Sequence, residues 1–264
     1  MVAPTPSRQP ALFIGHGSPM NAIEDNRYSR ALRALGAKLP RPRAVLCVSA
    51  HWYVPGTWVT GDERPKTIHD FGGFPQALFD MVYPAPGDPA LAKRVGALLG
   101  EGRGAPRLDW GLDHGTWTVL CHLFPDADVP VVQLALDAAL ATAGHLELGR
   151  RLAPLRDEGI LLLGSGNVTH NLRHALSQLR VADPPAAGFA VRFDAAVEEA
   201  LAARDGARLG ALLETPDGRM AHPTPDHYYP LLYVAGAAGE GDALEFPVTG
   251  LDLGSLSMRA ARFG

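Results

Sequence analysis

The sequence GILLLGSGNVTHN, residues 159–171, joins a short apolar run to a glycine-rich turn that carries a histidine. The run 159–163 is almost entirely apolar, which is typical of a strand buried on both faces of a sheet. Further short apolar runs, rich in β-branched residues, lie at 11–14, 44–49 and 129–136. The sequence therefore predicts four buried strands.

Helical patterns separate these strands. Apolar residues recur on one face of a helix over residues 28–39, 89–99, 146–156 and 186–203. In 28–39 they stand at i, i+4, i+7 and i+11. Alternating strands and helices predict an α/β fold, a single domain with a central mostly parallel sheet covered by helices on both faces. We expect this domain to span residues 11–264 and residues 1–10 to form a flexible N-terminal tail.

The composition excludes several classes of protein. The 264 residues include 47% hydrophobic and 20% charged residues with a net charge of −4, which excludes a disordered chain and offers no basic surface for nucleic acid or anionic lipid. No apolar run approaches the roughly 18 residues of a membrane span, and the proline-rich start lacks the apolar core of a secretory signal. Cys47 and Cys121 lie in apolar runs without a CxxC pattern. We expect a cytoplasmic enzyme.

Histidines follow the predicted strands. His16, His51 and His170 come at or just beyond the ends of three of them, and His114 lies in a turn before a predicted helix at 116–123. Ligands of open α/β sheets gather at the carboxyl ends of the strands, so we expect these side chains to converge. A cluster of neutral imidazoles without thiolates suits zinc or ferrous iron, and suits calcium or magnesium poorly.

Other histidines allow two interpretations. His227, in PTPDHYYP (223–230), is either a further ligand or a loop residue beside Asp226, which we expect to cap a helix at 228–235. His69, in TIHDFGGFP (67–75), belongs either to the wall of an aromatic pocket or to an ordinary packed loop. A structural role is favoured for the histidines within helical patterns, which are His122, His145 and His174; nothing but proximity to His227 distinguishes His222.

Ordered motifs over residues 11–256 carry a family resemblance. They are GHGSPMN (15–21), SAHW (49–52), IHDFGGFP (68–75), DHG (113–115), GSGNVTHNL (164–172) and PTPDHYYPLLYV (223–234), with GSLSM (254–258) near the C-terminus. On these motifs the chain resembles the class III extradiol ring-cleavage dioxygenases, and within them the single-domain 4,5-DOPA dioxygenase branch of plants and bacteria. The resemblance implies a ring-opening oxidoreductase that acts on a catechol with dioxygen.

The resemblance also implies a role for each histidine. His16 and His51 match the two histidine ligands of the metal, and His227 matches the position that completes the site, where the wider class has a glutamate. His170 matches the general acid/base and is also a candidate fourth ligand. His114 matches a second pocket histidine that helps to orient substrate or dioxygen.

The family chemistry explains these residue types. A catechol binds through two oxygens and dioxygen needs a third position, so three protein ligands leave the required room. The resemblance implies Fe(II) as the working metal, and the all-nitrogen ligand set makes Zn(II) an alternative occupant. Because a catechol ring needs a flat apolar wall, we expect substrate binding by His69, Phe71, Phe74 and Trp52.

Two alternatives keep the same histidines. A zinc hydrolase would use metal-bound water as nucleophile, and a non-catalytic metal-binding protein would need no turnover. The presence of His170 and His114 favours catalysis, since a structural metal site does not require two further pocket histidines. The sequence leaves open the natural catechol, the ring bond that is cleaved, the native metal, and whether the chain is a monomer or a homodimer.

Overall fold

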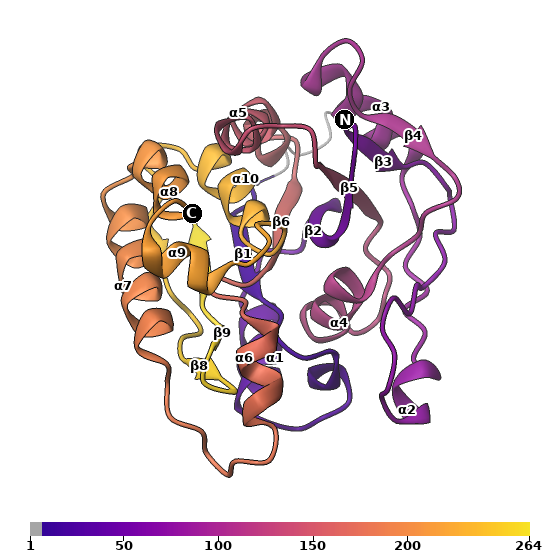
Figure 1. The fold of residues 1–264 in the computed structure, drawn as a ribbon. Coiled ribbons are helices and arrows are strands. Elements are labelled where there is room, and N and C mark those ends of the chain that lie inside the picture. Colours follow the sequence, from indigo (N-terminus) through magenta and orange to yellow (C-terminus); the bar gives the residue numbers. More distant parts are fainter. Residues whose placement is uncertain (1–6) are drawn as a thin grey trace.

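The computed structural model describes residues 7–264, and its strands confirm the α/β prediction (Figure 1). In chain order the strands are β1 (Ala11–Gly15), β2 (Ala44–Val54), β3 (Trp58–Thr60), β4 (Ala105–Arg107), β5 (Val131–Asp137), β6 (Ile160–Gly166), β7 (Leu244–Glu245), β8 (Leu251–Asp252), β9 (Leu256–Ser257) and β10 (Ala260–Phe263). The four predicted strands are β1, β2, β5 and β6, and they occupy the middle of the sheet.

The α-helices vary widely in length. They are α1 (Arg27–Gly36), α2 (Gln76–Phe79), α3 (Pro89–Leu99), α4 (His114–Leu123), α5 (Thr142–Leu152), α6 (Leu172–Gln178), α7 (Gly188–Ala202), α8 (Gly206–Leu212), α9 (Pro216–Ala221) and α10 (Tyr229–Ala237), with 3-10 turns at Pro19–Ala22 and Ala153–Arg156. None of these helices in residues 7–264 combines the length and apolar character that crossing a bilayer requires.

The main sheet has the strand order β4-β3-β5-β2-β6-β1-β10-β7. The central pairs β5–β2, β2–β6 and β6–β1 are parallel, whereas β10 and β7 add an antiparallel edge beside β1. The carboxyl ends of β1, β2, β5 and β6 therefore meet at one edge of the sheet. This edge collects the loops that carry the predicted site.

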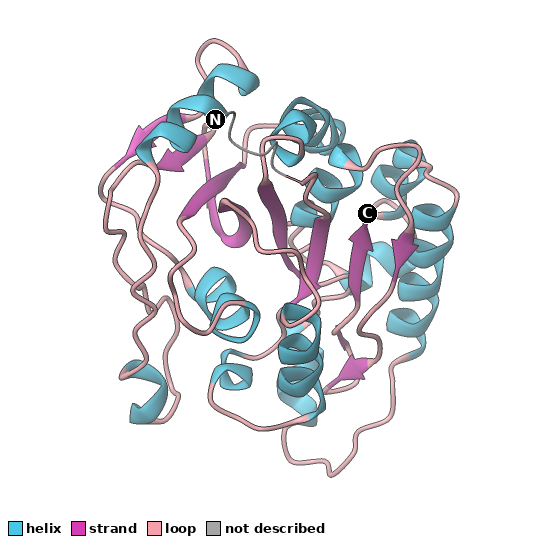
Figure 2. Cartoon of the chain, turned by 180° about the vertical axis from the view of Figure 1, so that it is seen from behind, coloured by secondary structure: helices cyan, strands magenta, loops and turns pink. Residues whose placement is uncertain are grey.

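The core lies in two layers, one on each face of the sheet (Figures 1 and 2). Alternate side chains of β6 show the division, because Leu162 packs with α3, α5, α7 and α10 while Leu161 packs with α1 and α4. Both side chains are almost inaccessible to solvent. Burying such a side chain stabilises the fold by about 1.5–3 kcal/mol, so both faces contribute to the same domain.

Two boundaries differ from the prediction in ways that affect the site. Strand β2 continues past residue 49 to Val54, with a shift of register against β5 between Val48 and Tyr53. His51 therefore lies within the irregular part of β2 instead of in a loop after it. Helix α4 begins at His114, two residues before the predicted start, because Asp113 caps it by accepting from the Thr116 backbone N–H.

The last two residues of the expected tail at residues 1–10 belong to the packed domain. Gln9 and Pro10 are buried, and the Gln9 backbone bonds to Arg156 in both directions, with its N–H donating to Arg156 O and its carbonyl accepting from Arg156 Nε. Because these bonds satisfy the backbone on both sides, the packed domain begins before Ala11. Residues 1–6 lie outside the described residues.

Candidate active site

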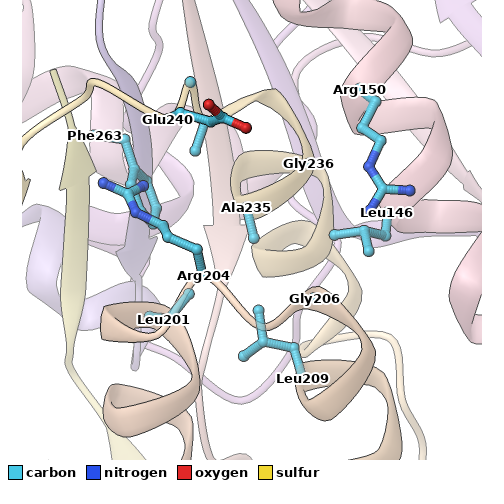
Figure 3. A pocket seen from close by; sticks show the side chains of 12 residues that line it. Leu146, Arg150, Leu201, Arg204, Gly206, Leu209, Ala235, Gly236, Glu240 and Phe263 are labelled. Atoms are coloured by element: carbon cyan, nitrogen blue, oxygen red, sulfur yellow. The ribbon is translucent and has the colours of Figure 1, made fainter.

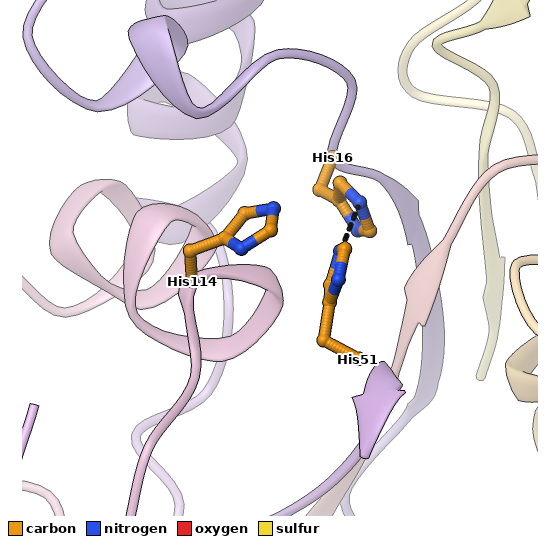
Figure 4. A group of neighbouring side chains, drawn as sticks. All are labelled: His16, His51 and His114. Carbon is orange, nitrogen blue, oxygen red and sulfur yellow. Dashed lines mark hydrogen bonds between the residues drawn. The ribbon is translucent and has the colours of Figure 1, made fainter. Parts of the chain in front are cut away.

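Five histidines meet at the carboxyl edge of the sheet. The ring centroids lie 5.0 Å apart for His16 and His51, 3.8 Å for His51 and His114, 4.9 Å for His51 and His227, and 3.5 Å for His227 and His170. Figure 4 shows the rings of His16, His51 and His114 turned toward one another. The convergence expected from strand ends is thus present in the structure. His227 is part of it, and a role in the capping loop alone does not explain that position.

Glycines permit this close assembly. A Cβ atom on Gly115 would lie 2.6 Å from Ser49 Oγ and 2.9 Å from His51 Cδ2, and one on Gly166 would lie 2.2 Å from His227 O. The N-terminus of α4 and the loop before α10 therefore reach the sheet only because these two positions lack a side chain. The loop before α10 is then held by the Asn167 backbone N–H, which donates to His227 O at 2.9 Å.

The tautomer of His16 follows from its neighbour Ser165. The Ser165 hydroxyl donates to Gly115 O, so its oxygen accepts from His16 Nδ1–H at 2.9 Å. The pKa of His16 lies well below its usual range, chiefly because the ring is buried and also because His51 and other histidines lie nearby. The ring is therefore neutral. A neutral ring with a proton on Nδ1 presents a lone pair at Nε2, which is the form that binds a metal.

His51 cannot satisfy both of its neighbours with one ring proton. Its Nε2 lies 3.2 Å from His16 Nε2, and its Nδ1 lies 3.4 Å from Asp70 Oδ2. Burial and the nearby His114 lower the pKa of His51 to about 3, so the ring is neutral. A proton on Nε2 leaves a lone pair against the Asp70 carboxylate, and a proton on Nδ1 leaves two lone pairs facing each other. A cation between the two Nε2 atoms removes this conflict.

The distance between these two nitrogens also fits a shared metal. Ligand nitrogens at about 2.0–2.1 Å from one tetrahedral zinc lie roughly 3.3 Å from each other. The observed 3.2 Å between His16 Nε2 and His51 Nε2 is close to that value. The donor set and its spacing therefore fit a transition-metal ion.

His227 supplies a third free nitrogen. Its Nδ1 bonds to the Asp226 carboxylate, so a neutral ring carries its proton there, and its buried Nε2 has no hydrogen-bond partner in the described residues. The expectation that Asp226 caps the following helix is wrong, because α10 has Tyr228 at its N-cap position with no side-chain cap, and Asp226 orients His227 instead. His170 stacks on His227 with ring planes 1° apart.

The tightest group of nitrogens differs from the expected ligand set. His16, His51 and His114 each offer a ligand atom with all three within 4.8 Å of one another. His114 was expected to orient substrate, and His227 to complete the site. Distance alone thus favours His114 as third ligand. His227 Nε2 and His114 Nδ1 both lack a hydrogen-bond partner in the described residues, but His114 Nδ1 lies 3.0 Å from the Asp70 carboxylate, which leaves His227 Nε2 as the nitrogen without a nearby charge.

A buried polar network supports the start of α4. The Asp113 carboxylate accepts from Ser49 Oγ and Gln133 Nε2, and the Gln133 side-chain oxygen accepts from Thr116 Oγ1 at 2.7 Å. Burial, with the charge of Asp70 adding to it, raises the pKa of Asp113 to about 6. The network fixes the helix turn that carries His114.

The expected substrate wall divides into two parts. Phe71 borders the cluster, with its ring centroid 5.5 Å from that of His114, and Phe74 packs against Phe71 at 5.4 Å. His69 packs edge-on against Phe71 and bonds through Nε2 to Met81 O. Trp52 is buried and stacks on Trp110 at 5.3 Å instead of lying among the histidines. Its assignment as a wall residue stays a prediction.

A separate cavity of about 230 Å³ lies between α5, α8 and α10 (Figure 3). Its walls include Leu146, Leu209 and Phe263, with two arginines at the rim, and none of the predicted site residues. Arg204 already donates to Asp242 O, and Arg150 pairs with Glu147. The histidine cluster, with its unpartnered nitrogens, is therefore the chemical centre of the molecule.

Comparison with known proteins gives one consistent answer. The family model described as "Catalytic LigB subunit of aromatic ring-opening dioxygenase" matches residues 10–262. The chain belongs to this family. It is 49% identical to the "4,5-DOPA dioxygenase extradiol" of Escherichia coli over 98% of this chain and 96% of that protein, and 38% identical to the protein of the same description from Beta vulgaris over 95% of each.

A solved structure supports the same assignment. The crystal structure of an uncharacterized protein from Escherichia coli K12 superposes with a TM-score of 0.84 and 44% identity, covering 97% of this chain and 100% of that one. The predicted family and fold are confirmed. The protein is a metal-dependent extradiol dioxygenase, an oxidoreductase that opens an aromatic ring.

Proposed function

We propose that the substrate is a DOPA-like catechol and that the working metal is Fe(II), with Zn(II) able to occupy the same ligands. The substrate class is supported by the relatives from Escherichia coli and Beta vulgaris, both described as 4,5-DOPA dioxygenases. Ferrous iron supplies electron transfer between a bound catechol and dioxygen, which zinc does not. The observation that carries the proposal is the set of three imidazoles, those of His16, His51 and His227, whose Nδ1 atoms each face a polar side chain and whose Nε2 atoms are left to bind a metal.

His16, His51 and His227 are the ligands in this proposal. Their Nδ1 atoms face Ser165, Asp70 and Asp226 respectively, which is the outer partner that metal-binding histidines usually have. His114 stays free for substrate or dioxygen, and His170 either completes the ligand set or acts on protons alone.

His170 is the general acid/base in this proposal. Burial lowers its pKa to about 4, so at neutral pH its ring is uncharged and able to accept a catechol proton. Stacking on His227 places it directly against a proposed ligand. Phe71 and Phe74 provide the apolar wall for the ring, with His69 behind Phe71.

The remaining expectations belong to the same proposal. The chain acts on small molecules in the cytoplasm, as a monomer or a homodimer, with neither nucleic acid nor membrane as partner. A zinc hydrolase and a non-catalytic metal-binding protein would use the same histidines, but the family match does not favour them.

The decisive experiment is anaerobic reconstitution with Fe(II), followed by dioxygen uptake with L-DOPA and simple catechols. We expect uptake and a yellow ring-opened product with iron and neither with zinc. Phe71→Ala should raise the KM for the catechol several-fold, by about 1 kcal/mol of lost ring contact. Stoichiometric iron without uptake on any catechol would contradict the proposed substrate class, and an unchanged KM would remove Phe71 from the wall.

A further inference from the structure

Asp70 differs from the other outer partners of the cluster because it faces two of the five histidines. Its Oδ2 lies 3.4 Å from His51 Nδ1 and 3.0 Å from His114 Nδ1, and its Oδ1 accepts from the His114 backbone N–H at 2.9 Å. The side chain is 18% exposed, so most of its surface is enclosed by the site. One carboxylate therefore faces both a proposed metal ligand and the pocket histidine.

The segment just before Asp70 is hydrogen-bonded to α4 and to the residues before it. The Ile68 backbone N–H donates to Leu112 O at 2.7 Å, the Leu112 N–H donates to Lys66 O at 2.8 Å, and Trp117 Nε1 donates to Ile68 O at 2.9 Å. These bonds fix the backbone two residues before Asp70. The carboxylate thus follows an anchored stretch of backbone, and its side chain turns toward the histidines although Asp70 as a residue is exposed.

We propose that Asp70 is a positioning residue that keeps the proton of His51 on Nδ1 and so keeps His51 Nε2 free for the metal. Without the carboxylate, the proton of His51 is better placed on Nε2, where it bonds to the lone pair of His16 Nε2. That tautomer cannot bind a metal at Nε2. The inference rests on the proposed assignment of His51 as a ligand.

An amide at this position tests the idea sharply. In Asp70→Asn the side-chain oxygen can still accept from the His114 N–H, but an NH₂ donor can now face His51 Nδ1 and favours a proton on Nε2. Asp70→Glu keeps the charge. Asp80→Asn removes a carboxylate from the same segment whose partner is Gln76, and serves as the matched control.

The experiment measures Zn(II) affinity of the metal-stripped full chain by competition with a chromophoric chelator. We expect Asp70→Asn to weaken binding about 10- to 100-fold, Asp70→Glu to recover part of the loss, and Asp80→Asn to bind as the wild type does. Wild-type affinity in Asp70→Asn overturns the role of Asp70 alone. Failure of the wild type to bind zinc overturns the proposed ligand set as well.

Two further measurements separate positioning from folding. In the His114→Ala background, Asp70→Asn should still weaken zinc binding, because the effect runs through His51; its disappearance there overturns the proposal. In the zinc-loaded wild type, NMR of the His51 ring should show an Nδ1 proton shifted downfield by the carboxylate. A proton shift typical of water contact overturns the proposal even if the Asp70→Asn chain does not fold.

Discussion

Two buried polar clusters lie at opposite edges of the sheet, and they differ in how completely their groups are paired. At the amino edge, Arg156 is fully buried and donates to Gln9 O, Ala237 O, Phe263 O and the Asp242 carboxylate. At the carboxyl edge, His227 Nε2 is buried and has no partner among residues 7–264, and His114 Nδ1 lies near Asp70 without the alignment of a hydrogen bond.

The difference separates stability from function. Each side-chain nitrogen of Arg156 has an acceptor, and these bonds join the start of the domain to its end. Removing one partner of such a buried charge lowers stability strongly. Unsatisfied buried nitrogens cost free energy, and where several of them converge, as in the histidine cluster, a bound ligand completes the pairing. The comparison predicts that substitutions at one edge change stability and those at the other change metal binding.

The largest effect is expected for the ligands. His51→Ala and His227→Ala should each lower metal affinity by at least about 100-fold, beyond the 10- to 100-fold cost of losing an outer partner, and abolish dioxygen uptake. His114→Ala should retain the metal. Metal content after dialysis and uptake with L-DOPA measure both effects.

A histidine with a paired nitrogen is the control for this series. His122 Nε2 donates to Asn21 O at 2.8 Å, so His122→Ala should lower stability by about 1–2 kcal/mol and leave metal affinity unchanged. The opposite result, in which His114→Ala loses the metal and His227→Ala keeps it, would identify His114 as the third ligand. The short distances from His114 to the other two ligands would then be the better guide than the unpaired Nε2 of His227.

The reverse pattern is expected at the amino edge. Arg156→Met removes the buried charge that faces Asp242 and the donor of three carbonyl groups, so we expect a loss of about 3–5 kcal/mol in the free energy of unfolding. Urea denaturation of the metal-free chain measures it, and zinc affinity below the transition should match the wild type. A variant that binds zinc more weakly while remaining folded would show that the two edges are coupled.

Much of the fold follows from local patterns. Three of the four runs that form the central strands are entirely or almost entirely apolar, so they could be found without tertiary information. Strand β5 starts at Val131, later than predicted, because Pro130 has no N–H for the sheet. Strand β10 was not predicted. Ala260–Phe263 is only four residues long and includes Arg262, and it forms a strand through its pairing with β1 and β7.

The site was predictable where side chains follow strands and not where they arrive from loops. His16, His51 and His170 could be placed from the strand ends. Asp70 could not be placed in this way, because its position depends on hydrogen bonds between its segment and residues before α4. The aromatic residues of the same motif, IHDFGGFP, indicated a substrate wall instead. The pairing of Asp226 with His227 was missed because an aspartate before a helix also suits a cap.

The smallest effect concerns a histidine that belongs to neither cluster. His145, on α5, is fully buried, stacks on Tyr229 at 3.9 Å, and has an Nε2 without a partner in the described residues. Burial lowers its pKa to about 4, whereas an unfolded histidine titrates near 6.5. Between these pH values the unfolded chain binds a proton that the folded chain excludes, so His145 makes stability fall as pH falls from about 6.5 to 4.

Replacing His145 by Gln should therefore flatten that fall. The slope of the free energy of unfolding against pH should decrease by up to about 1.4 kcal/mol per pH unit in this window, and stability above pH 7 sets the baseline for comparison. Urea denaturation of the metal-free variant and wild type at several pH values measures the slope. Because His145 packs against Tyr229 and Tyr233 and not among the clustered histidines, added zinc should leave the difference in slope unchanged. Equal slopes would mean that the folded chain accepts the proton at His145, and that an unpaired buried nitrogen outside the site carries no such cost.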